Sequence, residues 1–105
     1  MTGVRLSDEV LEDLWQAVVH VAHERVAVLE SAVWALLAEE PDVVERCAAG
    51  VEEAHKLVGS LDSYARTGGS ALALRAATLL EAPEPDVAEL VEVVRALRAT
   101  VDGTT

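Results

Sequence analysis

Residues 53–64 read Glu-Ala-His-Lys-Leu-Val-Gly-Ser-Leu-Asp-Ser-Tyr, and the rest of the chain is best understood from this stretch. At the helical spacing of 3.6 residues per turn, Ala54, Leu57 and Leu61 fall on one side, which we expect to face a core. His55 lies about 100° or more away from that side, so its ring is expected at the rim or in solvent. The stretch therefore predicts an amphipathic helix with a histidine on its outer face.

The same outer strip carries Gly59, one turn after His55, and then Asp62. A glycine in the middle of a helix costs about 1 kcal/mol relative to alanine. A partner's backbone or a phosphoryl group that comes close to the helix would explain this glycine. A second explanation needs no ligand: Gly59 merely allows two helices to pack closely, and His55 is an ordinary surface histidine.

The composition predicts one small helical domain over residues 1–105, with loose ends at 1–6 and 102–105. Its formal net charge of −11 argues against nucleic acid and against an anionic membrane as partners. The single cysteine, Cys47, excludes an internal disulfide and fits the reducing cytoplasm. Residues 1–14 lack the basic start and apolar segment of a signal peptide, so we expect a cytoplasmic protein.

Prolines and glycines break the chain at residues 39–42, 67–70 and 82–86, and apolar stripes at helical spacing lie between these breaks. Two helices are expected before the first break, and a third helix is expected from about 42 to 66. A glycine of the second break is expected to end it in the left-handed cap conformation.

The N-terminal part of the chain has no such break, because neither glycine nor proline occurs between Ser7 and Glu40. Ser7 is a good N-cap for a first helix. A short first helix and a longer second one either run together or meet at a kink within residues 17–21. Trp15 is expected to close one end of the core, and Trp34 to lie in the core or at its rim.

Burying every stripe is simplest in an all-α fold, an antiparallel up-and-down four-helix bundle with an additional short N-terminal helix. Strand-like alternation is absent from the sequence. The expected core residues are Leu29, Val33, Leu57, Leu61, Leu72, Leu79, Leu90 and Leu97.

His20 and His23 are three residues apart and could share a helical face. Two ligands are too few for a closed zinc site, even with Glu24 beside them. Solvated surface histidines are the better account, and we expect no metal site.

The stretch Ala54-His55-Lys56-Leu57-Val58-Gly59-Ser60-Leu61 resembles the phosphoacceptor motif of histidine-containing phosphotransfer (HPt) domains. The shared features are the histidine, a leucine two residues on, a glycine four on and a small hydroxyl residue five on. Weaker similarity at residues 14–15, 25–30 and 63–81 extends the resemblance over most of the chain.

The chain departs from the HPt pattern at two positions. The family commonly has a lysine three residues after the histidine, where this chain has Val58, and often a glycine where it has Ala65. Lys56 is the nearest cation in sequence, but it points about 100° away from His55 around the helix.

The resemblance implies a phosphorelay carrier. A ring nitrogen of His55, expected to be Nε2, would accept a phosphoryl group from the aspartate of a response-regulator receiver domain and pass it to another receiver. The implied phosphate environment is Lys56, Gly59 and Ser60, and the implied docking surface is Val58 and Asp62.

The resemblance also implies the partners, which are a receiver domain, a hybrid histidine kinase, or both. Mg²⁺ is expected on the receiver, whereas this chain would bind no cofactor, act as a monomer and turn over no substrate by itself. Two alternatives remain open. One is an adaptor that docks a receiver or kinase without phosphotransfer, which Val58 in place of lysine favours; the other is a dimerisation bundle with no signalling role.

Overall fold

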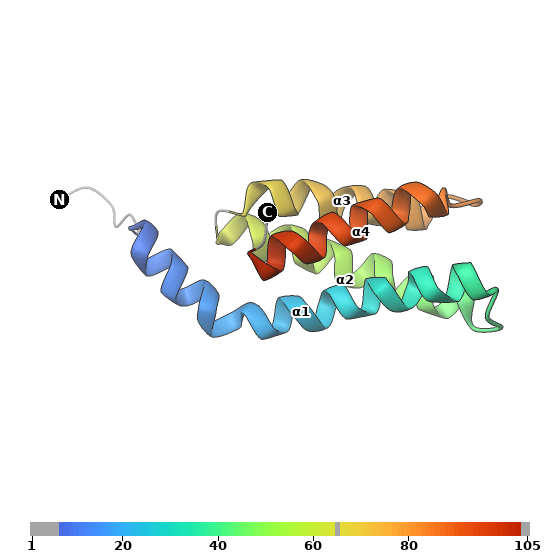
Figure 1. Ribbon diagram of the computed structural model, residues 1–105, viewed down its shortest axis with the longest axis horizontal. Helices are drawn as coiled ribbons and strands as arrows, with labels where there is room; N and C mark the ends of the chain where they lie inside the picture. Colours follow the sequence, from blue (N-terminus) through green and yellow to red (C-terminus); the bar gives the residue numbers. More distant parts are fainter. Residues whose placement is uncertain (1–6, 65, 104–105) are drawn as a thin grey trace.

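The computed structural model describes residues 7–64 and 66–103, and in this part of the chain there are four α-helices and no strand. The predicted all-α class is therefore confirmed for the described residues. Figure 1 shows the helices side by side along the long axis of the molecule. The helices are α1 (Asp8–Ala38), α2 (Val43–Ser63), α3 (Thr67–Glu81) and α4 (Val87–Asp102).

Each helix packs against two others: α2 contacts α1 and α3, and α4 contacts the same two helices. The side chains between them form one hydrophobic cluster to which all four helices contribute. Seven of the eight predicted core residues are buried, and the eighth, Leu72, is half-buried against the cluster. The largest fully buried side chains are Val26, Leu29, Leu57, Leu61, Leu90 and Leu97.

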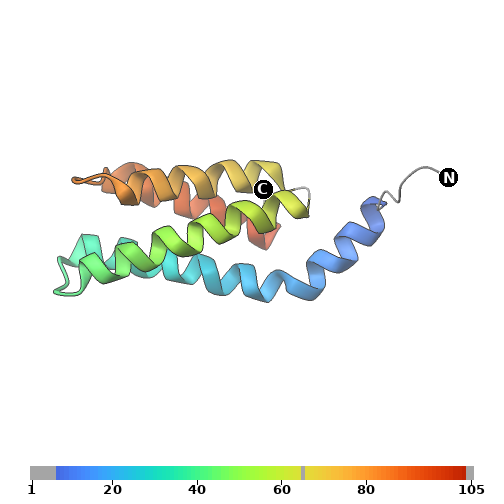
Figure 2. The same cartoon turned by 180° about the vertical axis from the view of Figure 1, so that it is seen from behind.

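The predicted short N-terminal helix is not a separate element, since α1 is one helix over Asp8–Ala38. No glycine or proline interrupts its backbone hydrogen bonds. Figures 1 and 2 show instead that α1 bends and that its first turns extend past the ends of the other helices. Val10 and Leu14, two apolar residues of these first turns, are therefore exposed. Trp15 is buried and packs against Tyr64, so it closes this end of the core as predicted.

The connection between α2 and α3 also differs from the prediction. α2 ends at Ser63, and Gly68 and Gly69 lie inside the first turn of α3 without a positive φ. The N–H of Arg66 donates to the carbonyl of Leu61 at 2.7 Å, so α2 closes without a left-handed glycine. The predicted glycine cap is therefore wrong.

Trp34 is 68% exposed, although the sequence suggested the core or its rim. Its helix buries a narrow stripe that contains Ala32, Val33 and Ala35, and Trp34 points away from it. Leu37 is exposed for the same reason.

Loose ends were predicted at residues 1–6 and 102–105, and the prediction is wrong at Asp102 and Gly103. Residues 1–6 and 104–105, predicted to be loose, lie outside the described residues, as does Ala65. Asp102 is the last residue of α4 and is not frayed, and Gly103 caps the helix with a positive φ.

Candidate functional site

His55 lies in the second half of α2 and points away from the core. The helix is fixed beneath it by Ala54, Leu57 and Leu61, which are fully buried. The side chain of His55 is 55% exposed, as the helical spacing predicted. The imidazole is therefore accessible from solvent while the backbone that carries it is held by the core.

The space above Gly59 is open. A Cβ added at Gly59 would meet no atom within 4 Å. A Cβ added at Gly50, in the same helix, would lie 2.9 Å from Cδ1 of Leu80 and 3.4 Å from Cβ of Ala32. Close helix packing therefore accounts for Gly50 and does not account for Gly59. One turn beyond His55, α2 offers a bare stretch of backbone to whatever approaches the ring.

Glu81, the last residue of α3, lies beside the histidine. Its Oε1 is 3.7 Å from Nε2 of His55, which is too long for a hydrogen bond but close enough for an ion pair with a protonated ring. Both side chains are more than half exposed. Exposed pairs of this kind are worth at most about 1 kcal/mol, so solvent or a partner can separate them.

The cations next to the site are engaged by carboxylates. Nζ of Lys56 lies 3.3 Å from Glu53 and 3.6 Å from Glu52. Arg25 of α1 lies 3.5 Å from Glu53 and donates a hydrogen bond of 2.8 Å to Oγ of Ser60. The Ser60 hydroxyl itself donates to the carbonyl of Lys56. Lys56 and Ser60 thus lie on the side of α2 that faces α1, about 100° or more around the helix from His55.

Arg25 contacts Ser60 and Glu53 but is not among the site residues that the sequence predicted. It belongs to the stretch 25–30, where the sequence suggested a weak resemblance to HPt domains, and this suggestion was the only available signal. Its proximity to Ser60 depends on how α1 and α2 pack, which neither segment specifies alone.

Val58 and Asp62, the predicted docking residues, are both partly committed to the fold. Val58 is half-buried and packs against the core. Asp62 accepts a hydrogen bond of 2.6 Å from Oγ of Ser70, which links α2 to α3. The exposed strip around His55 therefore consists of the ring, the open backbone over Gly59 and the side chain of Asp62, which remains exposed.

The other histidines lie on α1. His20 is exposed, whereas Nδ1 of His23 lies 2.8 Å from Nη1 of Arg98 and 3.3 Å from Oδ1 of Asp102. His23 therefore contacts α4 rather than a shared ligand. Among the described residues, no three His, Cys, Asp or Glu side chains are grouped so that they could hold a metal ion.

Comparison with known proteins adds no relative: no protein-family model, no curated protein and no solved structure matches this chain. None of the helices in the described part of the chain has the length and apolar character needed to cross a membrane. The chemistry of the site must therefore be argued from its geometry, which is an exposed imidazole on a fixed helix with open space beside it.

Proposed function

We propose that this chain is a phosphorelay carrier of the HPt type. His55 accepts a phosphoryl group from the aspartate of a response-regulator receiver domain and passes it to another receiver. The observation that carries the proposal is the exposed ring of His55 beside the open space over Gly59. A phosphoryl group can reach such a ring without any change in the backbone of α2.

Imidazole suits this reaction because it is largely neutral near pH 7 and keeps a lone pair on one nitrogen. With the ring proton on Nδ1, Nε2 of His55 attacks the phosphorus of the aspartyl phosphate in line. The N–P bond forms as the P–O bond breaks, and the electron pair leaves with the aspartate carboxylate. Such transfer depends mostly on positioning and charge neutralisation. The receiver supplies Mg²⁺ and a lysine, and this chain supplies the nucleophile and the docking surface.

Two charged side chains near His55, those of Lys56 and Glu81, influence its reaction with a phosphoryl group. The contacts of Lys56 with Glu52 and Glu53 are on the surface and weak, so its ammonium can turn toward a bound phosphoryl group. The carboxylate of Glu81 lies beside Nε2 of His55 and must turn away, because it would repel the phosphoryl oxygens.

We also propose that the four helices form an antiparallel up-and-down bundle. Two contacts support it: Glu12, near the start of α1, pairs with Arg66, just after α2, and Asp62, near the end of α2, bonds Ser70, near the start of α3. The proposal also includes a cytoplasmic monomer whose partners are a receiver domain, a hybrid histidine kinase, or both.

The direct test is phosphoryl transfer from a panel of receiver domains that are first phosphorylated by a small phosphodonor in the presence of Mg²⁺. We expect wild type to gain acid-labile, base-stable phosphate, which peptide mapping places on His55. The His55→Gln variant should gain none, and His20→Gln and His23→Gln should be labelled like wild type. Label that persists on His55→Gln would refute the assignment.

A second pair of variants tests the open space. Gly59→Glu should fold, since nothing lies within 4 Å of its Cβ, but transfer should fall because the carboxylate fills the gap and repels the phosphoryl group. Gly59→Ala is the matched control and should retain transfer. Equal transfer by both variants would show that the space over Gly59 has no role.

An adaptor without phosphotransfer is the second candidate function. It is favoured by Val58, where HPt domains commonly have lysine, and by the engagement of Lys56 and Arg25 with carboxylates. An adaptor would bind a receiver without gaining label, and His55→Gln would bind it as tightly as wild type does.

A further inference from the structure

An apolar groove lies at the end of the molecule where α1 turns into α2 and α3 turns into α4. Its volume is about 500 Å³. The first turns of α2 form one wall, and the end of α3 with the following proline-rich turn forms the other. Val44, at its edge, is 74% exposed. The main lining residues are Val44, Cys47, Val51, Leu80, Pro83 and Pro85.

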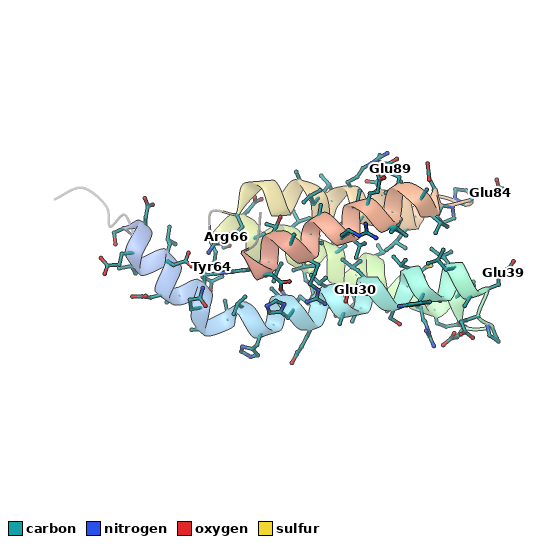
Figure 3. All side chains as sticks on the ribbon, in the orientation of Figure 1. Glu30, Glu39, Tyr64, Arg66, Glu84 and Glu89 are labelled. Carbon is teal, nitrogen blue, oxygen red and sulfur yellow. The ribbon has the colours of Figure 1, made fainter. Side chains whose placement is uncertain are left out.

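The surroundings of this groove are strongly acidic. Residues 39–52 and 81–89 contain nine carboxylates and one arginine. Two of these carboxylates pair with cations from outside the segments, Glu52 with Lys56 and Glu89 with Arg75, which leaves a net charge of −6. Figure 3 shows Glu39 and Glu84 on the two turns at this same end. The one arginine, Arg46, is paired with Asp42 at 2.9 Å. The groove therefore combines an apolar floor with a negative rim.

We propose that this groove binds a basic amphipathic helix of a partner protein. The apolar face of such a helix would cover Val44 and the neighbouring lining residues, as in other cases where an amphipathic helix occupies a groove. Lysines or arginines on its remaining faces would meet the acidic rim, which speeds association and selects the partner. An acidic helix, a nucleic acid or an anionic lipid surface would be repelled by the same charges.

A second groove on the molecule lacks this combination of an apolar floor and a negative rim. It lies between α1 and α4, has a similar volume of about 490 Å³ and includes the exposed Trp34. Its charged lining residues are Glu30, which is paired with Arg98, and Arg95. This mixed charge does not favour a basic partner, and the lining of the second groove is also less apolar.

The inference does not depend on phosphotransfer, because none of its steps requires a phosphoryl group. The two sites nevertheless adjoin, since Glu81 both lines the groove and lies beside His55. A lysine of the bound helix that pairs with Glu81 would move this carboxylate away from Nε2.

Cys47 provides a direct probe, because it is the only cysteine of the chain and it lines the groove. Partial burial raises the pKa of its thiol, so its reaction with a thiol reagent is slow enough to follow. The ligand is a synthetic peptide of leucine and lysine at helical spacing, about 14 residues long or four helical turns. We expect saturating peptide to slow the modification of Cys47 at least about tenfold, whereas a leucine and glutamate peptide of the same pattern should not slow it.

Variants locate the binding site. Val44→Arg places a cation at the edge of the groove, and because Val44 is exposed the variant should fold. Its affinity for the leucine–lysine peptide, measured by fluorescence anisotropy, should fall about tenfold, which corresponds to about 1.4 kcal/mol. Leu74→Arg on the exposed face of α3 is the matched control, since it makes the same change of net charge elsewhere. Its affinity should stay within about twofold of wild type.

Three results would overturn the proposal. The first is unchanged reactivity of Cys47 at saturating leucine–lysine peptide. The second is equal binding of the leucine–glutamate peptide. The third is an equal loss of affinity in Val44→Arg and Leu74→Arg, which would show that the peptide senses only the net charge and not the groove.

Discussion

Gly50 and Gly59 of α2 have different environments, so alanine should have a less favourable effect on stability at Gly50 than at Gly59. Gly59→Ala should raise the free energy of unfolding by up to about 1 kcal/mol, because the site is exposed and alanine favours the helix. Gly50→Ala should be less stable than Gly59→Ala by about 1–3 kcal/mol, because its Cβ would lie 2.9 Å from Cδ1 of Leu80 and that buried side chain must shift. Urea unfolding followed by circular dichroism measures both. A loss of stability in Gly59→Ala would mean that the space over it is not open.

The charge of Glu81 can be tested independently of the fold, since its side chain is exposed. Removing the carboxylate in Glu81→Gln should speed phosphoryl transfer to His55 by up to about fivefold, as expected for an exposed charge pair of about 1 kcal/mol or less. The gain should shrink as salt is added, because salt screens the repulsion. Glu84→Gln removes the same charge from the neighbouring turn and is the control. A slower transfer in Glu81→Gln would instead assign this carboxylate a supporting role.

At the scale of elements, the first turns of α1 are held by a small cluster at the end of the core. The rings of Trp15 and Tyr64 lie 5.8 Å apart between centroids, and the guanidinium of Arg66 lies 4.9 Å from the Trp15 ring. Arg66 also pairs with Glu12, one turn before Trp15. Figure 3 shows Tyr64 and Arg66 next to this part of α1. Because these turns extend past the other helices, the cluster is their main support.

This cluster predicts a local response to acid. Hydrogen bonds from Gln16 and Arg66 lower the pKa of Glu12 below its ordinary value. The stability that the Glu12 carboxylate contributes is therefore complete above the ordinary glutamate pKa and is lost as pH falls through the lowered value. The protection of amides in the first turns of α1, measured as their exchange rate relative to that of an unstructured chain at the same pH, should fall over this acidic range before protection elsewhere does.

The control for this response is Glu12→Gln, which cannot titrate at this position. The protection of its amides in the same turns should be lower at neutral pH and should change less on acidification than protection in wild type. If both proteins respond equally to acid, another carboxylate controls the start of α1.

At the scale of the whole molecule, the net charge of −11 opposes compaction. The ion pairs between helices, such as Arg75 with Glu89 and Arg98 with Glu30, are at least partly exposed and contribute little. We therefore expect the melting temperature to rise as salt is increased from about 0.01 M to about 1 M, over which the screening length falls from about 30 Å to about 3 Å.

The control for the salt effect is the same titration at a lower pH, where carboxylates are neutralised and self-repulsion is smaller. The rise in melting temperature should be smaller there. A melting temperature that falls with salt at neutral pH would mean that the ion pairs outweigh the repulsion.

The helical segments and most of their inner faces can be predicted from the sequence alone. These follow from local properties: apolar residues such as Leu57, Leu61 and Leu97 recur at the helical period, and prolines and glycines separate the segments. The same periodicity determined that His55 and Gly59 lie on the outside of α2. It did not determine that α1 would be one bent helix, because a helix without glycine or proline can bend or end for reasons outside its own sequence.

The contacts between side chains of different helices could not be predicted in this way. The contacts of Arg25 with Ser60 and of Glu81 with His55 join residues far apart in sequence, so they depend on the packing of whole helices. The exposure of Trp34 also depends on helix packing. The helical period places Trp34 beside an apolar stripe, but it does not fix how wide a stripe of α1 the neighbouring helices cover. The groove likewise depends on packing. The turn between α1 and α2 and the turn between α3 and α4 are far apart in sequence. Their apolar and acidic residues form one surface only because the helix ends lie next to each other.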